Sequence, residues 1–298
     1  MMKKLFLCAL LLTSLAAYPA GNGSSMWMLV AEASMPVTAD NSQPDVRFAS
    51  LDSLVYYMTN RYINTPEDLV GYYNEASLAM KSYWQLNHQG GDPSGIDDEV
   101  CNELMVLADS LSFWSTMDMV QSNLIGGAVS QYNTAKAYIA RCGDSFYQDE
   151  MREWMALENK LADYYSDVAY LANWGGSIAH VISTGSYNFL ASVRQEDYSG
   201  LFHGAQFESC DRTLSELRAE LIHQLAGAKA FAAEPYDDDI RYTSLAEHLC
   251  QTADELPLLF DKWQAARARL CKSQGIPESH TASLVAQLIS EMHALIED

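Results

Sequence analysis

The sequence predicts an all-α protein, an antiparallel bundle of about eight to ten helices, and three observations support this. Apolar residues recur at spacings of three and four through most of the chain after residue 48. Clusters of Gly, Pro and Asp interrupt the pattern where loops are expected. No stretch alternates apolar and polar residues with a period of two, which a half-buried strand would require.

Residues 1–20 have the pattern of a secretory signal peptide. Lys3 and Lys4 precede an apolar run that is too short to span a bilayer, and small residues follow it. Cleavage after Ala16 or Ala17 fits best, with Ala20 as the alternative. Cys8 lies inside the apolar run without a lipoprotein context. We therefore expect a secreted or periplasmic protein that is not a lipoprotein and has no membrane span.

Residues 21–47 are weakly patterned and are expected to form a linker or flexible arm. An N-terminal helical unit is expected at 48–205. Its first stripe begins at Phe48, and Thr65-Pro66 is a helix start with an N-cap followed by proline. Gly126-Gly127 is expected to cut or bend a later helix of this unit.

The helix best defined by its pattern begins near Tyr147. Its apolar stripe is followed by Gly175-Gly176, where a helix end favours a left-handed residue, and Ser177 is offered as the N-cap of the next helix. A C-terminal helical unit is expected at 206–298. Pro257 is expected to kink its long apolar stripe or to divide it into two helices.

The charge of the chain is strongly acidic. Asp and Glu total 39 against 18 Lys and Arg, which gives a formal net charge of −21. Such a surface repels nucleic acid and favours basic partners. We expect a protein partner and no nucleic acid.

Two segments align without gaps around a tryptophan. Both have an apolar residue three before Trp154 or Trp263, alanine two after it and leucine seven after it. Whether this marks a true repeat of two similar helical units stays open. In the second segment Arg267 and Cys271 follow Trp263 at spacings of four, so the three side chains share one helix face. The arginine can lie on the indole ring or hold a carboxylate of a facing helix, and Cys271 can staple the helix end to a neighbour.

The spacing of Trp263, Arg267 and Cys271 resembles the LprI-like family of secreted bacterial helical proteins, which is named for a lysozyme inhibitor. The resemblance covers roughly residues 97–205 and 207–290, as two degenerate copies. The first copy has Glu158 and Ala162 where the family has Arg and Cys. It carries the family's glycine corner, with an arginine further on: Gly175, Gly176, Ser177 and Arg194.

The resemblance implies inhibition of a basic lysozyme-type hydrolase. The alternative is a cell-envelope structural or assembly module that binds another envelope protein without catalysis. The family pattern suggests a disulfide between Cys210 and Cys271. A second pair, Cys101 with Cys142, is a weaker expectation for a secreted chain.

The sequence predicts no catalytic residues, cofactor or metal site, and hence no enzyme. Histidine pairs with zinc spacing, Cys-x-x-Cys and Gly-x-Ser-x-Gly are all absent from the sequence. The acidic residues Asp149, Glu150 and Glu153 are interpreted as the first turn of a helix, where they complement the helix dipole.

Overall fold

The computed structural model describes residues 44–61, 63–88, 95–113, 115–173, 175–203, 210–233 and 240–297. Across these residues the chain forms nine α-helices and one 3-10 turn, with no strand, which confirms the all-α prediction. The expected signal peptide at 1–20 and residues 21–43 of the expected arm lie outside the described residues.

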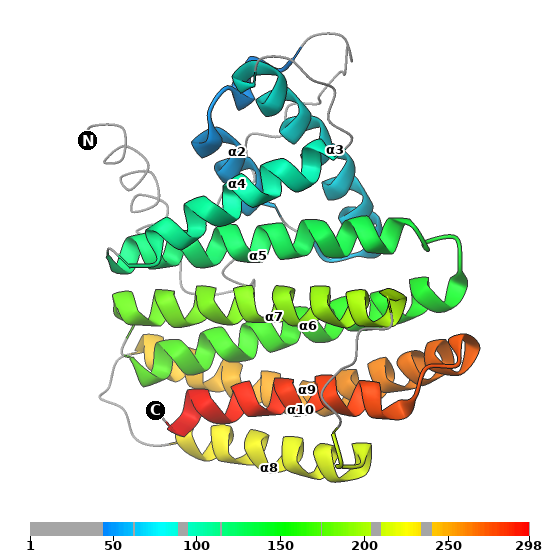
Figure 1. The fold of residues 1–298 in the computed structure, drawn as a ribbon. Coiled ribbons are helices and arrows are strands. Elements are labelled where there is room, and N and C mark those ends of the chain that lie inside the picture. The colour runs from blue at the N-terminus through cyan, green and yellow to red at the C-terminus, as the bar shows by residue number, and fades with distance from the viewer. Residues whose placement is uncertain are drawn as a thin grey trace.

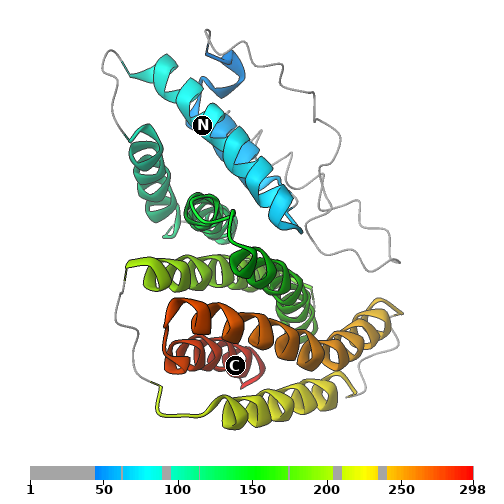
Figure 2. The same cartoon turned by 90° about the vertical axis from the view of Figure 1, so that its right-hand side faces the viewer.

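The helices are arranged as a stack (Figure 1). The long helices α5 to α10 lie roughly side by side, α2, α3 and α4 gather at one end, and α8 closes the other end in both views (Figures 1 and 2). The elements are η1 Val46–Phe48, α2 Leu51–Thr59, α3 Pro66–Asn87, α4 Ile96–Leu111, α5 Thr116–Ile139, α6 Ser145–Ala172, α7 Ser177–His203, α8 Leu214–Ala232, α9 Ile240–Gln274 and α10 Glu278–Glu297.

The predicted helix start at Thr65-Pro66 is confirmed. The Thr65 hydroxyl accepts a hydrogen bond from the backbone N–H of Asp68, and the Asp68 carboxylate accepts one from the backbone N–H of Thr65. Thr213 and Glu216 make the same reciprocal pair at the start of α8. Each such cap contributes about 0.5–2 kcal/mol, because it satisfies N–H groups that have no partner inside the helix.

Gly126-Gly127 does not cut the helix, which was one of the two outcomes that the sequence suggested. Both glycines lie inside α5, which continues unbroken from Thr116 to Ile139. A Cβ atom on Gly127 would overlap the ring of Tyr187, and one on Gly126 would approach Asn188 of α7 at 2.8 Å. The two glycines therefore let α7 approach α5 closely. These helices, two apart in the chain, run parallel, because Asn123 hydrogen bonds to Val181 and Ser130 hydrogen bonds to Ser192.

Pro257 does not divide its stripe into two helices. α9 continues through it from Ile240 to Gln274. Leu256 and Phe260, on either side of the proline, are both buried in the core. Proline removes one backbone hydrogen bond and disturbs one turn. The apolar burial on both sides outweighs that local cost.

The glycine corner between α6 and α7 forms as predicted at Gly175, whose φ of +67° is in the left-handed region. Its N–H donates to the carbonyl of Tyr170 at 3.1 Å. Ser177 is the first residue of α7, one position inside the N-cap that the sequence suggested.

The core is continuous across the described chain. Buried residues from α2 to α10 belong to one apolar cluster, and α6 packs along α9. The expected boundary at residues 205 and 206 falls in the connection between α7 and α8, and residues from both sides of it contribute to this core. None of the described helices is long and apolar enough to cross a membrane.

Candidate functional site

The two tryptophans of the aligned segments meet in the core. Trp154 of α6 and Trp263 of α9 are fully buried, with ring centroids 5.4 Å apart and ring planes at 66°, an edge-to-face contact. The other aligned positions also correspond in burial. The apolar residues and leucines are buried and the alanines are exposed: Met151 and Phe260, Leu161 and Leu270, Ala156 and Ala265.

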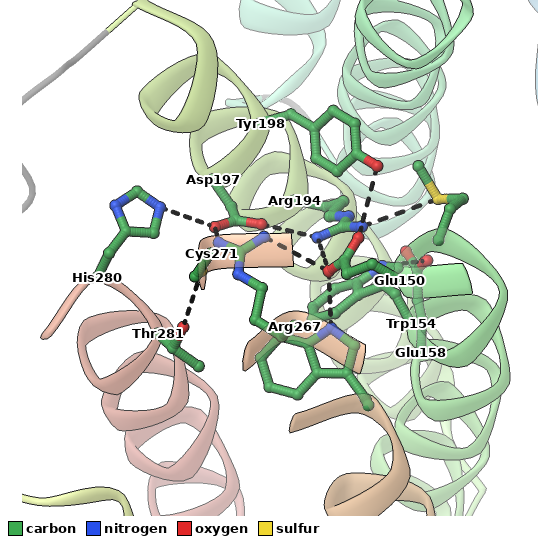
Figure 3. Close-up of polar contacts among 12 residues, drawn as sticks. Glu150, Trp154, Glu158, Arg194, Asp197, Tyr198, Arg267, Cys271, His280 and Thr281 are labelled. Carbon is green, nitrogen blue, oxygen red and sulfur yellow. Dashed lines mark hydrogen bonds and ion pairs between the residues drawn. The ribbon is translucent and has the colours of Figure 1, made fainter. Parts of the chain in front are cut away.

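A group of charged side chains lies beside the two indole rings (Figure 3). Four helices supply it, and we call it the buried charge cluster: Glu150 from α6, Arg194 and Asp197 from α7, Arg267 from α9 and His280 from α10. The two acids and two arginines are at most 2% exposed, and the imidazole is 10% exposed. Charges at that depth persist only when they are paired.

The side chain of Glu150 accepts hydrogen bonds from several donors. Arg194 donates to its two oxygens from Nη1 at 3.0 Å and from Nη2 at 2.6 Å, which is a bidentate pair. The Trp263 Nε1–H donates to Oε1 at 2.9 Å, and Arg267 Nη1 lies 3.4 Å from the same oxygen. One carboxylate of α6 thus binds side chains of α7 and α9.

Asp197 is the second anion of the cluster. It accepts from Arg194 Nη1 at 2.7 Å, from Arg267 Nη2, and from His280 Nε2 at 3.1 Å. Burial alone would raise its pKa. The guanidinium of Arg267, the hydrogen bond from His280 and the charge of Arg194 together outweigh burial and hold the pKa below its ordinary value. Asp197 is therefore ionised at neutral pH.

The sequence offered Arg267 two roles, lying on an indole ring or holding a carboxylate, and the structure shows the second. Arg267 holds the carboxylates of Glu150 and Asp197. Arg194 holds the same two acids and also lies over the rings of Trp154 at 4.6 Å and Tyr198 at 4.2 Å. Two carboxylates face two guanidiniums, so these four charges balance. The cluster joins α6, α7, α9 and α10, and its acids and arginines are buried.

The sequence prediction missed the acidic members of this cluster. The interpretation of Asp149, Glu150 and Glu153 as a first turn is wrong, because α6 begins at Ser145 and its first turn holds no acid. The side chain of Glu150 is moreover fully buried. A usable signal was present: Glu150 precedes Trp154 by four residues, and Asp197 follows Arg194 by three, so each acid shares a helix face with a core residue. His280 carried no comparable signal.

Neither expected disulfide forms, because all five cysteines of the described residues are free thiols. The thiol of Cys271 lies 3.9 Å from the hydroxyl of Thr281 on α10 instead of meeting Cys210. The thiol of Cys142 donates to the carbonyl of Ile139 at 3.2 Å, whereas Cys101 is buried in the core. Burial raises the pKa of Cys101 to about 12 and also raises that of Cys271. Packing between the helices, and not a disulfide bond, holds these helix ends together.

A small cavity of about 20 Å³ lies beside the charge cluster. Thr134, Glu158 and Arg194 supply much of its polar lining, and Trp154 lies against it. The Glu158 carboxylate accepts from Trp154 Nε1 at 2.8 Å, and burial raises the pKa of Glu158 against the opposing charge of Arg194. A volume of that size holds about one water molecule.

No group of three or more His, Cys, Asp or Glu side chains in the described ranges is placed to hold a metal ion. Comparison of the chain with family models, curated proteins and solved structures returns no match.

Proposed function

We propose that this chain is a secreted or periplasmic binding protein that acts on a basic protein through its acidic exterior, without catalysis. The observation that carries the proposal is where the charges lie. The acidic excess is a property of the surface, because the basic side chains are largely engaged by acids of the same chain.

Most lysines and arginines in the described residues pair with a carboxylate. Two of them, Arg194 and Arg267, are buried in the charge cluster, where no partner can reach them. Eight others pair nearer the surface: Arg47, Arg61, Lys136, Arg152, Lys160, Arg212, Arg218 and Lys229. With a net charge of −21, the exterior is left with an excess of unpaired acid, which steers cationic proteins toward it.

The resemblance of Trp263, Arg267 and Cys271 to the LprI-like pattern suggests the class of partner, a basic lysozyme-type hydrolase. Arg267 and Trp263 bind the same carboxylate of Glu150, so in this proposal the shared motif stabilises the scaffold and the exterior carries the recognition. Inhibition then results from binding of the acidic exterior to the cationic surface of the hydrolase.

The test is a cell-wall lysis assay with a basic lysozyme and the purified chain, at low salt and at about 0.5 M salt. We expect inhibition and co-retention at low salt and loss of both at high salt, because exposed charges are screened over roughly 10 Å at 0.1 M ionic strength. The same lysozyme with its lysines acetylated is the matched control and should not be inhibited. Absence of both inhibition and retention at low salt would contradict the proposal.

The alternative, a module that assembles with another envelope protein, is favoured by one observation. Val106 and Phe113, in α4 and the turn after it, are 69% and 88% exposed, and neighbouring exposed apolar side chains are a feature of docking surfaces. An assembly partner would be retained at high salt, because apolar contacts are not screened. Recovery of a stable complex from the native envelope in about 0.5 M salt would favour assembly over inhibition.

The location belongs to the same proposal, and processing tests it directly. Expression of the full chain in a bacterium should yield a periplasmic or secreted product whose N-terminus, read by Edman sequencing, follows residue 16, 17 or 20. An uncleaved cytoplasmic product would contradict the location.

A further inference from the structure

α4 presents a surface of unusual composition. Residues Ile96–Leu111 contain no Lys, Arg or His and include five acidic residues: Asp97, Asp98, Glu99, Glu103 and Asp109. The inner side of the helix packs into the core through Val100, Leu104 and Ala108. Among the described helices α4 contacts chiefly α3 and α5, so its outer side faces away from the stack of α6 to α10 (Figure 1).

The outer side of α4 carries apolar side chains. Met105, Val106 and Phe113, the last in the turn after α4, are 38%, 69% and 88% exposed. Val106 lies on α4, and Phe113 lies in the turn two residues after the last helical residue, Leu111. Single exposed apolar residues are ordinary, but three close together on one helix and the turn that follows it form a patch.

Two acidic residues that form no ion pair within the described residues flank this patch. Glu99 lies seven residues before Val106 and Asp109 three residues after it, so both share the Val106 side of α4, and both are exposed. Neither pairs with a cation in the part of the chain that the structure describes, whereas Asp98 pairs with Lys136 and Glu103 contacts the imidazole of His88. We define the α4 face as Glu99, Met105, Val106, Asp109 and Phe113.

We propose that the α4 face is a docking surface for a basic amphipathic helix of a partner protein. An apolar anchor of the partner would cover Val106 and Phe113, and its lysines or arginines would meet Glu99 and Asp109. Charge complementarity selects this occupant, because the face offers two unpaired carboxylates around an apolar stripe and no cation. This inference rests on the proposed binding function and assigns it to one surface.

The experiment measures the affinity of a synthetic peptide for the full chain by isothermal titration. The probe is a Leu/Lys peptide of about 18 residues with leucines at helical spacing. Its control has the same composition in scrambled order, so that no apolar face forms. Two double variants change the α4 face: Val106→Ser with Phe113→Ser, and Glu99→Gln with Asp109→Asn.

Matched control variants remove equally exposed groups from other helices. Ile178→Ser with Leu258→Ser removes apolar side chains that are 59% and 60% exposed. Glu196→Gln with Glu247→Gln removes two exposed carboxylates of α7 and α9. Circular dichroism verifies that every variant is folded, which is expected because all eight positions are exposed.

We expect each α4 double variant to weaken binding of the amphipathic peptide about tenfold or more. The affinity of the control variants should stay within about twofold of that of the unmodified chain. Equal loss in the control variants, or equal affinity for the scrambled peptide, would overturn it. A chain that fails to inhibit lysozyme but keeps α4-dependent peptide binding refutes the hydrolase proposal alone. Lysozyme inhibition that the α4 variants leave unchanged refutes the α4 inference alone.

Discussion

Glu150 is the residue whose change tests the buried charge cluster most sharply. In Glu150→Gln the amide keeps an oxygen acceptor for the Trp263 Nε1–H but loses the negative charge. Arg194 and Arg267 then share one remaining carboxylate, Asp197. All three are at most 2% exposed, so the excess positive charge has no water to solvate it.

The expected cost is about 3–5 kcal/mol, the usual consequence of removing one partner from a buried ion pair. A total stability of roughly 5–15 kcal/mol makes that a large fraction. For a domain of this size each kcal/mol lowers the melting temperature by about 2–4 °C, so we expect a decrease of roughly 6–20 °C.

The assay is urea unfolding followed by circular dichroism, with a thermal scan as the second measurement. Glu153→Gln is the matched control: it makes the same substitution one turn further along α6, at a partly exposed residue with no ion pair among those described. We expect it to change the free energy of unfolding by less than about 0.5 kcal/mol. A Glu150→Gln variant as stable as the Glu153→Gln control would refute the reasoning.

Three further predictions concern packing, pH and thiols. Gly127→Ala should lower the free energy of unfolding by about 1–3 kcal/mol in urea titrations, since its Cβ would overlap Tyr187, whereas Gly227→Ala, with open space around its Cβ, should raise it by about 1 kcal/mol. Burial raises the pKa of Asp167 to about 6, and the hydrogen bond to Asp167 raises that of His248, so this pair holds more protons in the folded chain than in the unfolded chain. The contribution of this pair to the free energy of unfolding should therefore fall as pH rises from about 5 to 8, and Asp167→Asn should remove that contribution; an equal pH dependence in the variant would contradict the assignment. All five described cysteines should be alkylated in denaturant without reductant, and Cys101 should react slowly in the native protein, as mass mapping would show; a Cys210–Cys271 crosslink would contradict the structure.

The helices were predictable because helix signals are local. The apolar stripe around Trp154 and the capping box at Thr65 depend on residues within a few turns. The glycine corner at Gly175 was predictable for the same reason, because a left-handed residue ends a helix wherever it occurs.

The errors arose where a distant neighbour decides the outcome. Glycine has a low helix propensity, but the absence of a side chain at Gly127 lets Tyr187 of α7 pack against α5. This packing stabilises the unbroken helix. Glu150 lies among acidic residues that resemble an ordinary exposed turn of a helix. Only its ion pairs with Arg194 and Arg267 from other helices place it in the core. Cys271 shares a face with Arg267 as predicted, but α10 brings Thr281, not a second thiol, to that position.

The central claim is that residues from both halves of the chain build one buried charge cluster. A double-mutant cycle between Asp197 of α7 and Arg267 of α9 measures it most directly, with Asp197→Asn, Arg267→Met and the double variant unfolded in urea. We predict a coupling of about 1.5–3 kcal/mol, because residues that share a buried ion pair do not act independently. Effects that add within about 0.5 kcal/mol would contradict the claim.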